Sequence, residues 1–229
     1  MRILVVGAGA VGGYFGGRMA LAGQDVTFLV REARAKELAE NGLVIKSPNG
    51  DAKVSNVKTV LSTRIDGPYD LVLLSCKAYD LENAMDAFAS AVGPSTTILP
   101  MLNGMRHLEV LGERFGRERV VGGVCLIAAT LDASKAIVQM TDMHAIVFGE
   151  LDGVARPRID AIASALRAGG FDVDVTDAIV QQMWEKWVFL ATLAGSTCLF
   201  RASVGAILGA PGGEAAMRAL FDECAAVAA

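Results

Sequence analysis

The chain is poor in charged and in aromatic side chains: 20% of its 229 residues are charged and 6% are aromatic. Hydrophobic residues make up 53%, which excludes an intrinsically disordered chain and indicates a packed globular protein. The formal net charge of −4 provides no general attraction to nucleic acid or to an anionic membrane. We therefore expect no nucleic-acid partner and no membrane partner, and any anion-binding site has to be local.

Cysteine and histidine are also scarce, with four cysteines and two histidines in the chain. No two cysteines form a C-x-x-C pair, and neither histidine is spaced to complete a zinc site. This pattern predicts reduced, mostly buried thiols in a cytoplasmic protein, with no metal site. Glycines interrupt the apolar run at the N-terminus, unlike in a signal peptide, and no apolar stretch approaches the roughly 18 residues that span a bilayer.

Strand-like and helix-like segments alternate over most of the chain, and their hydrophobic spacing predicts where they lie. We expect buried strands at residues 2–6 and 70–75, and further strands at residues 25–30, 96–99, 120–126 and 171–175. We expect helices at residues 10–22, 33–40, 81–91, 105–115 and 158–168. The turn residues 48–51 predict a hairpin over 43–57, and the loose alternation over 136–149 predicts antiparallel strands at the sheet edge. Such alternation implies an α/β fold with right-handed crossovers and a doubly wound sheet.

Only helical segments are expected after about residue 177, at 178–193 and 214–227. The shift in composition near residue 176 predicts one domain over 1–176 and an all-α domain over 177–229. The last helix is rich in alanine and has no stop signal before residue 229, so we expect the helical domain to be truncated. A domain of this length is short for covering a ligand cleft. Either further residues or a partner subunit would supply the cover, which leaves a homodimer open.

The first predicted strand leads directly into Gly7-Ala8-Gly9-Ala10-Val11-Gly12, a G-x-G-x-x-G pattern. A strand before this pattern and a helix after it are the context of a dinucleotide-binding turn. Gly7 permits the tight turn, Gly9 lets the backbone approach the pyrophosphate, and Gly12 lets the helix pack closely on the strand. The N-terminus of the helix would present unpaired N–H groups to the phosphates. Residues 1–176 are therefore predicted to form a Rossmann-type dinucleotide-binding domain.

The end of the second predicted strand indicates which dinucleotide is bound. An NAD-binding domain usually carries an acidic residue there, whereas this strand ends at Arg31, with Arg34 one helical turn further on. A guanidinium group suits a 2′-phosphate because it offers positive charge and bidentate geometry. Glu32 is adjacent and could still reach the ribose, and two solvated arginines at a helix start are the alternative. The pattern favours NADPH as the cofactor, bound by residues 7–12 and Arg31.

Five motifs, in order along the chain, make the sequence similar to the ketopantoate reductase (2-dehydropantoate 2-reductase) family. They are Arg2–Gly13, Lys77 in Ser75-Cys76-Lys77-Ala78-Tyr79, Asn103-Gly104, Gly149-Glu150, and Lys186 in Met183-Trp184-Glu185-Lys186. The resemblance implies an NADPH-dependent oxidoreductase that reduces a 2-keto acid to a 2-hydroxy acid, as in the conversion of 2-dehydropantoate to pantoate in pantothenate biosynthesis. It also implies Lys186 and Asn103 as catalytic residues, and Lys77 and Asn103 as cofactor-binding residues.

The residues themselves agree with this chemistry. Lys77 and Asn103 directly follow apolar strands, so we expect both at the carboxyl ends of a parallel sheet, where open α/β sheets bind ligands. A lysine ammonium can stabilise a developing alkoxide and donate a proton to it. Lys186 lies at the margin of an apolar helix face, between Met183 and Leu190. The plainer alternatives are two solvated lysines and an asparagine that caps the following helix.

Two positions depart from the family pattern. Leu190 and Ala194 stand where the family carries asparagines that hold the substrate, which predicts a substrate other than, or broader than, ketopantoate. Ser196, Thr197 or Arg201 would then bind the carboxylate. The same departure favours an alternative function, a non-catalytic NADPH-binding redox sensor or regulator. A related β-hydroxyacid or amino-acid dehydrogenase is a third hypothesis.

Overall fold

The structure is a computed structural model that describes residues 1–229 and divides them into two compact units. The first unit comprises residues 1–102 and 106–179, and the second comprises residues 103–105 and 180–229. The main division thus follows residue 179, and the short segment 103–105 leaves the first unit to join the second.

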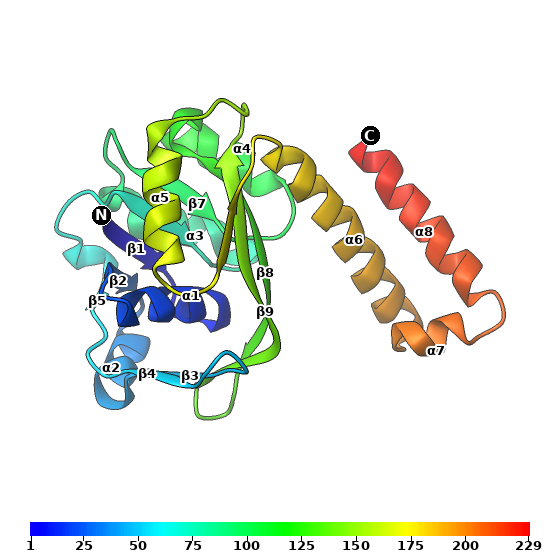
Figure 1. The fold of residues 1–229 in the computed structure, drawn as a ribbon, viewed down its shortest axis with the longest axis horizontal. Coiled ribbons are helices and arrows are strands. Elements are labelled where there is room, and N and C mark those ends of the chain that lie inside the picture. Colours follow the sequence, from blue (N-terminus) through cyan, green and yellow to red (C-terminus); the bar gives the residue numbers. More distant parts are fainter. The chain divides into compact units, whose positions relative to one another are not determined.

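The first unit is built on a parallel sheet with the strand order β5-β2-β1-β6-β7 (Figure 1). Its strands are β1 (Arg2–Val6), β2 (Asp25–Leu29), β5 (Thr59–Val60), β6 (Leu71–Leu74) and β7 (Thr97–Pro100). The helices that follow β1, β2, β6 and β7 are α1 (Ala10–Leu21), α2 (Glu32–Asn41), α3 (Leu81–Phe88) and α4 (Arg106–Phe115). The short 3-10 helices are η1 (Ser62–Arg64), η2 (Ala78–Asp80), η3 (Ala89–Ala91) and η4 (Arg117–Arg119). The predicted alternation of strands and helices is confirmed.

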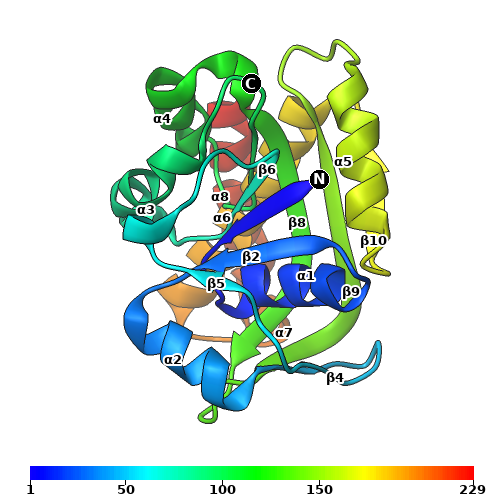
Figure 2. The same cartoon turned by 90° about the vertical axis from the view of Figure 1, so that its left-hand side faces the viewer.

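A second sheet has the order β10-β9-β3-β4, with β8 also paired to β9. Its strands are β3 (Leu43–Lys46), β4 (Ala52–Val54), β8 (Val121–Leu131), β9 (Ile137–Glu150) and β10 (Asp172–Val175), and α5 (Pro157–Arg167) precedes β10. Figure 2 shows α5 beside β10. The hairpin predicted over 43–57 is confirmed as the antiparallel pair β3 and β4.

The prediction of antiparallel edge strands over 136–149 is wrong in part, because this segment is the single strand β9 with three partners. One side of β9 pairs antiparallel with β8, while the other side pairs parallel with β3 near residue 137 and with β10 near residue 146. A strand of 14 residues extends over roughly 45 Å, long enough to have different neighbours along its length. Local alternation indicates a strand but not its partners.

The core of the first unit consists of two clusters of buried side chains, one on each face of the parallel sheet. Consecutive residues of a strand point to opposite faces, so Ile3 and Val5 of β1 belong to one cluster, and Leu4 and Val6 belong to the other. All four side chains are buried. Such strands are typical of parallel sheets covered by helices on both faces.

The second unit is helical, with α6 (Ile179–Phe200) leading into it, followed by α7 (Val204–Leu208) and α8 (Gly213–Ala228). Helix α6 extends beyond the predicted 178–193, and α7 was not predicted. The chain turns after α6 at Arg201, which has a φ of 49°, and the Ser203 hydroxyl then caps α7 by accepting the N–H of Ala206. None of the helices combines the length and the apolar character needed to cross a membrane.

Candidate functional site

The turn between β1 and α1 requires glycine at residues 7 and 12, each for a different geometric reason, and leaves Gly9 in open space. Gly7 has a φ of +93°, in the left-handed region that favours glycine. A Cβ at Gly12 would lie 2.5 Å from the Gly7 carbonyl oxygen and would also overlap the Ser75 hydroxyl, so only glycine lets α1 pack this closely. A Cβ at Gly9 would meet no atom within 4 Å. The backbone at Gly9 is therefore open to an approaching group.

A cavity of about 970 Å³ lies at this turn, at the carboxyl end of the parallel sheet. The turn itself, the start of α2, the segment after β6 and the β8–β9 hairpin all contribute to its lining. The cavity is large enough for a dinucleotide-sized ligand. No acidic side chain lies in the first turn of α1, so the unpaired N–H groups of that helix start are available to phosphate. The residues present thus fit a dinucleotide.

Two arginines line this cavity, one with an exposed side chain and one whose side chain is held by contacts within the protein. The Arg31 side chain is 82% exposed, and its Nη2 donates to the Asp80 carboxylate at 3.0 and 3.2 Å. The Arg34 side chain is 18% exposed, donating from Nη1 to Glu37 at 2.6 Å and from Nη2 to the Ala8 carbonyl at 3.0 Å. Arg34 is therefore held by the protein, tying α2 to the glycine turn. The exposed Arg31 can exchange Asp80 for an anionic ligand.

Lys77 also belongs to the first unit, where it precedes η2. Its side chain is exposed and does not contribute to the cavity lining, whereas the neighbouring Cys76 does. Burial raises the pKa of the Cys76 thiol to about 11, and the charge of Asp80 adds to the effect. The thiol is therefore protonated at neutral pH and is a poor nucleophile.

Asn103 and Lys186 both lie in the second unit. Asn103 is exposed in the loop after β7, and Gly104 follows with a φ of +83°. A Cβ at Gly104 would lie 3.8 Å from the Trp187 indole, so this loop packs on α6 one residue from Lys186. The structure thus brings the Asn103 loop to the helix segment that carries Lys186, whose side chain is half-buried.

The three residues proposed to bind a substrate carboxylate lie in different environments. Ser196 is fully buried, and its hydroxyl has no hydrogen-bond partner. Thr197 donates its hydroxyl to the Leu193 carbonyl at 2.7 Å, within the same helix. Arg201 is exposed and lies beyond the end of α6. The fourteen residues 187–200 of α6 separate Lys186 from Arg201, or roughly 22 Å along the axis, which is far for one small keto acid.

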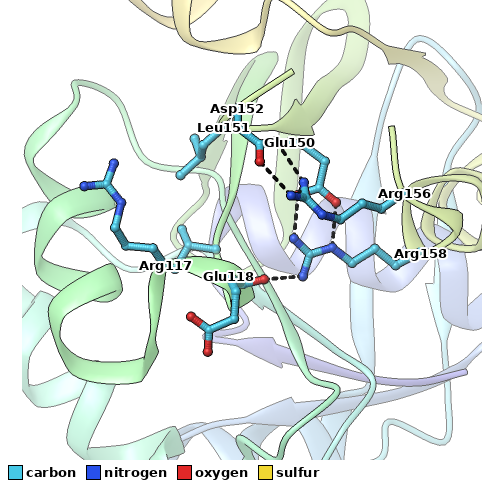
Figure 3. A pocket seen from close by; sticks show the side chains of 8 residues that line it. Arg117, Glu118, Glu150, Leu151, Asp152, Arg156 and Arg158 are labelled. Atoms are coloured by element: carbon cyan, nitrogen blue, oxygen red, sulfur yellow. Dashed lines mark hydrogen bonds and ion pairs between the residues drawn. The ribbon is translucent and has the colours of Figure 1, made fainter. Parts of the chain in front are cut away.

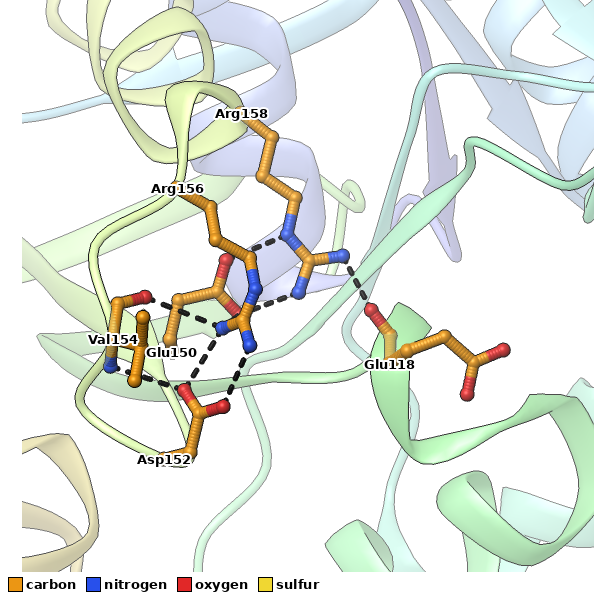
Figure 4. Close-up of polar contacts among 6 residues, drawn as sticks. All are labelled: Glu118, Glu150, Asp152, Val154, Arg156 and Arg158. Atoms are coloured by element: carbon orange, nitrogen blue, oxygen red, sulfur yellow. Dashed lines mark hydrogen bonds and ion pairs between the residues drawn. The ribbon is translucent and has the colours of Figure 1, made fainter.

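Glu150 lies in a separate ionic cluster of the first unit (Figures 3 and 4). Its carboxylate is 4% exposed, accepts a hydrogen bond from Arg158 Nε at 2.7 Å and forms an ion pair with Arg156 at 3.1 Å. Arg156 also pairs with Asp152 at 2.6 Å, and Arg158 donates to the Glu118 carbonyl at 2.5 Å. Glu150, Asp152, Arg156 and Arg158 line the cavity of about 370 Å³ beside this cluster, and their charges are paired with one another. These contacts tie β9 to the start of α5 and indicate a structural role.

Besides Glu37, which pairs with Arg34, two charged residues on the lining of the larger cavity were missed by sequence reasoning. Asp80 lies in η2, and Lys135 lies at the tip of the β8–β9 hairpin. Both reach the glycine turn only through tertiary folding, although the turn chemistry of residues 132–134 was a visible signal near Lys135. No group of histidine, cysteine, aspartate and glutamate side chains is arranged to hold a metal ion.

Comparisons with known protein families gave two matches. Residues 3–153 match the model of "Ketopantoate reductase PanE/ApbA", and residues 178–229 match that of "Ketopantoate reductase PanE/ApbA C terminal". Among curated proteins, the uncharacterized oxidoreductase YkpB of Bacillus subtilis is 39% identical over 227 residues, which are 99% of this chain and 74% of that protein. A 2-dehydropantoate 2-reductase of Mesorhizobium japonicum is 26% identical over 248 residues, covering 99% of this chain and 76% of that protein.

Solved structures are similar over the whole chain. The 2-dehydropantoate 2-reductase of Geobacter metallireducens superposes with a TM-score of 0.91 at 32% identity, covering 100% of this chain and 75% of that one. A D-mandelate dehydrogenase solved with NADH and anilino(oxo)acetate has a TM-score of 0.88 at 21% identity, covering 100% of this chain and 73% of that one. The second likeness concerns the fold alone.

Proposed function

Because this chain belongs to the ketopantoate reductase family, an oxidoreductase family that uses NAD(P)H, we propose that it reduces a 2-keto acid to the 2-hydroxy acid with NADPH. The observation that carries the proposal is the glycine turn at the large cavity. There the backbone at Gly9 is open, and Arg31 stands at the end of β2 with its guanidinium exposed.

Bound NADPH supplies the hydride. Residues 7–12 bind its pyrophosphate through backbone N–H groups, and Arg31 binds the 2′-phosphate in place of its present partner Asp80. Arg31 stands after β2 where an NAD-binding domain usually carries the acidic residue that holds the ribose hydroxyls, and the acidic Glu32 follows it on the lining. Lys77 lies beside the lining residue Cys76 and adds positive charge near the cofactor.

Lys186 is the general acid of the proposed reaction. As hydride reaches the keto carbon, charge develops on the oxygen, and the Lys186 ammonium stabilises that charge and donates the proton. The Asn103 amide orients the carbonyl and contacts the cofactor. The packing of Gly104 on Trp187, which brings the Asn103 loop to the Lys186 segment of α6, supports this pairing of roles.

The substrate is a 2-keto acid other than ketopantoate, or a range that includes it. Leu190 and Ala194 follow Lys186 by one and two helical turns and offer no hydrogen bond to a substrate hydroxyl. A site that recognises a hydroxyl group loses discrimination sharply when its polar partners are replaced. The same two residues support a second candidate, an NADPH-binding sensor without turnover.

The test is a titration of the purified protein with NADPH, followed by oxidation assays with ketopantoate and a panel of small 2-keto acids. We expect NADPH binding and turnover with at least one keto acid. The variant Lys186→Ala should retain binding and lose about 10²–10⁴ in kcat, the usual contribution of a general acid. The matched control Glu185→Gln changes the neighbouring exposed residue and should keep wild-type rates. NADPH binding without turnover on any keto acid would favour the sensor.

A further inference from the structure

The tip of the β8–β9 hairpin forms part of the cofactor cavity. Leu131 and Lys135, at the two ends of the tip, lie on the same lining as the glycine turn and the start of α2. The tip is attached to β3, since Lys46 Nζ lies 2.7 Å from the Asp132 carboxylate. Figures 1 and 2 show this hairpin end at the same end of the first unit as β3 and α2.

Lys135 is held in a conformation that L-residues rarely adopt. Its φ is 64°, and Arg201 is the other non-glycine residue with a positive φ. The Asp132 carboxylate fixes the turn by accepting the N–H groups of Ser134 and Ala136 at 2.9 and 3.0 Å, while the N–H of Lys135 donates to the Asp132 carbonyl at 2.9 Å. Strained residues of this kind persist where surrounding bonds over-determine them, and they cluster at ligand clamps.

Lys135 also differs from the other cations on the lining in having no carboxylate paired with it. Arg31 and Arg34 each form an ion pair, with Asp80 and Glu37 respectively. The Lys135 ammonium forms no ion pair, and its side chain is exposed. An anion that enters the cavity therefore gains the attraction of Lys135 without first displacing a carboxylate.

We propose that Lys135 binds a phosphate group of the dinucleotide, so that the cofactor is held between the glycine turn and the hairpin tip. Asp132 is a positioning residue that directs Lys135 toward the cavity. This inference rests on the proposed function, because it concerns the same cofactor. It adds a phosphate-binding residue from a segment about 130 residues away along the chain. The glycine motif by itself gives no indication of such a residue.

The experiment compares dissociation constants for NADPH and NADH, followed by nicotinamide fluorescence at low and at physiological salt. The variants are Lys135→Gln, Asp132→Ala, and the matched control Lys36→Gln, which removes the same charge from the exposed face of α2 outside the lining. We expect Lys135→Gln to weaken NADPH binding about tenfold at low salt and less at high salt, as for a charge-assisted contact in solvent. Asp132→Ala should weaken it less, and Lys36→Gln should leave it unchanged.

The NADH titration identifies the phosphate, and either of its results supports the proposal. If Lys135 faces the 2′-phosphate, NADH binding is unaffected; if it faces the pyrophosphate, both cofactors weaken together. Equal NADPH affinities for Lys135→Gln and Lys36→Gln, with wild-type binding intact, would overturn the role of Lys135 and leave the proposed function standing. A wild-type protein that binds neither dinucleotide overturns both. Thermal unfolding without cofactor checks that each variant is folded.

Discussion

The two units present their candidate chemistry with different parts of the chain. In the first unit the cavity is shaped by backbone, since the turn needs glycine at residues 7 and 12 and leaves Gly9 open. In the second unit the chemistry depends on side chains along one helix, where Lys186 is followed by the apolar Leu190 and Ala194. A turn whose geometry requires glycine tolerates few substitutions. On a helix face, by contrast, each substitution changes the chemical groups that the face presents. The glycine turn carries the pattern that the resemblance to the family predicts, and Leu190 and Ala194 are positions at which the chain departs from it.

The units differ in burial as well. The first unit encloses two buried clusters, one on each face of its parallel sheet. The helices of the second unit bury few side chains, and several large apolar ones are exposed, including Phe189, Leu199, Phe221 and Val227. Regions with few buried apolar contacts open at lower free energy. Hydrogen exchange should therefore be faster in α6–α8 than in the parallel sheet.

The largest effects are expected at two glycines of the turn between β1 and α1, where the backbone shapes the cavity. Gly12→Ala should lower the free energy of unfolding by roughly 1–3 kcal/mol, because the new methyl group overlaps the Gly7 carbonyl. Gly9→Ala should leave stability unchanged, because nothing lies within 4 Å of the new methyl. It should weaken NADPH binding tenfold or more by blocking the approach of the pyrophosphate. Urea unfolding and NADPH titration measure the two effects.

The two glycine variants act as controls for one another. If Gly9→Ala cost as much stability as Gly12→Ala, the open side of the turn would not exist. If Gly9→Ala bound NADPH like the wild type, the pyrophosphate would lie elsewhere.

A smaller effect concerns pH, since both histidines, His107 and His144, belong to the first unit. Burial lowers the pKa of His107 to about 4, and its Nε2 has no hydrogen-bond partner. Between about pH 6.5 and 4 the unfolded chain binds a proton that the native state does not, so stability falls as pH falls. The free energy of unfolding should be about 2 kcal/mol lower at pH 5 than at pH 7.

His107→Leu should remove most of this pH dependence in urea unfolding. His144→Leu is the control, because burial also lowers the pKa of His144 but its side chain is less buried. An unchanged pH dependence in His107→Leu would show that ionisable groups other than His107 cause the loss of stability at acidic pH.

The smallest expected effect is at the Arg31 ion pair. Asp80→Asn releases an exposed guanidinium and removes a negative charge from the cavity, which should tighten NADPH binding about 2–5-fold, with less effect on NADH. Asp86→Asn is the control, because Asp86 pairs with Arg114 outside the lining. Weaker NADPH binding in Asp80→Asn would mean that Asp80 holds Arg31 in its binding geometry.

Some elements could be predicted from the sequence because their signals are local. The strand at residues 2–6, the helix from residue 10 and the hairpin around residues 48–51 all follow from spacing and turn residues, and the structure has them. Helix α7 could not be predicted, because a five-residue helix has no hydrophobic period to detect. The pairing of β9 with β3 and β10 could not be predicted for a different reason, because tertiary packing determines which strands pair.

By itself, the sequence determined the alternating architecture, the glycine turn and the family to which the chain belongs. These depend on the backbone preferences of neighbouring residues and on motifs that can be matched in order. Only the tertiary structure decided that Arg34 is bound to the Ala8 carbonyl, that Arg31 is paired with Asp80, and that Lys135 lies on the lining of the cavity at the glycine turn. Each of these contacts joins segments that are distant along the chain, and only the folded sheets bring such segments together.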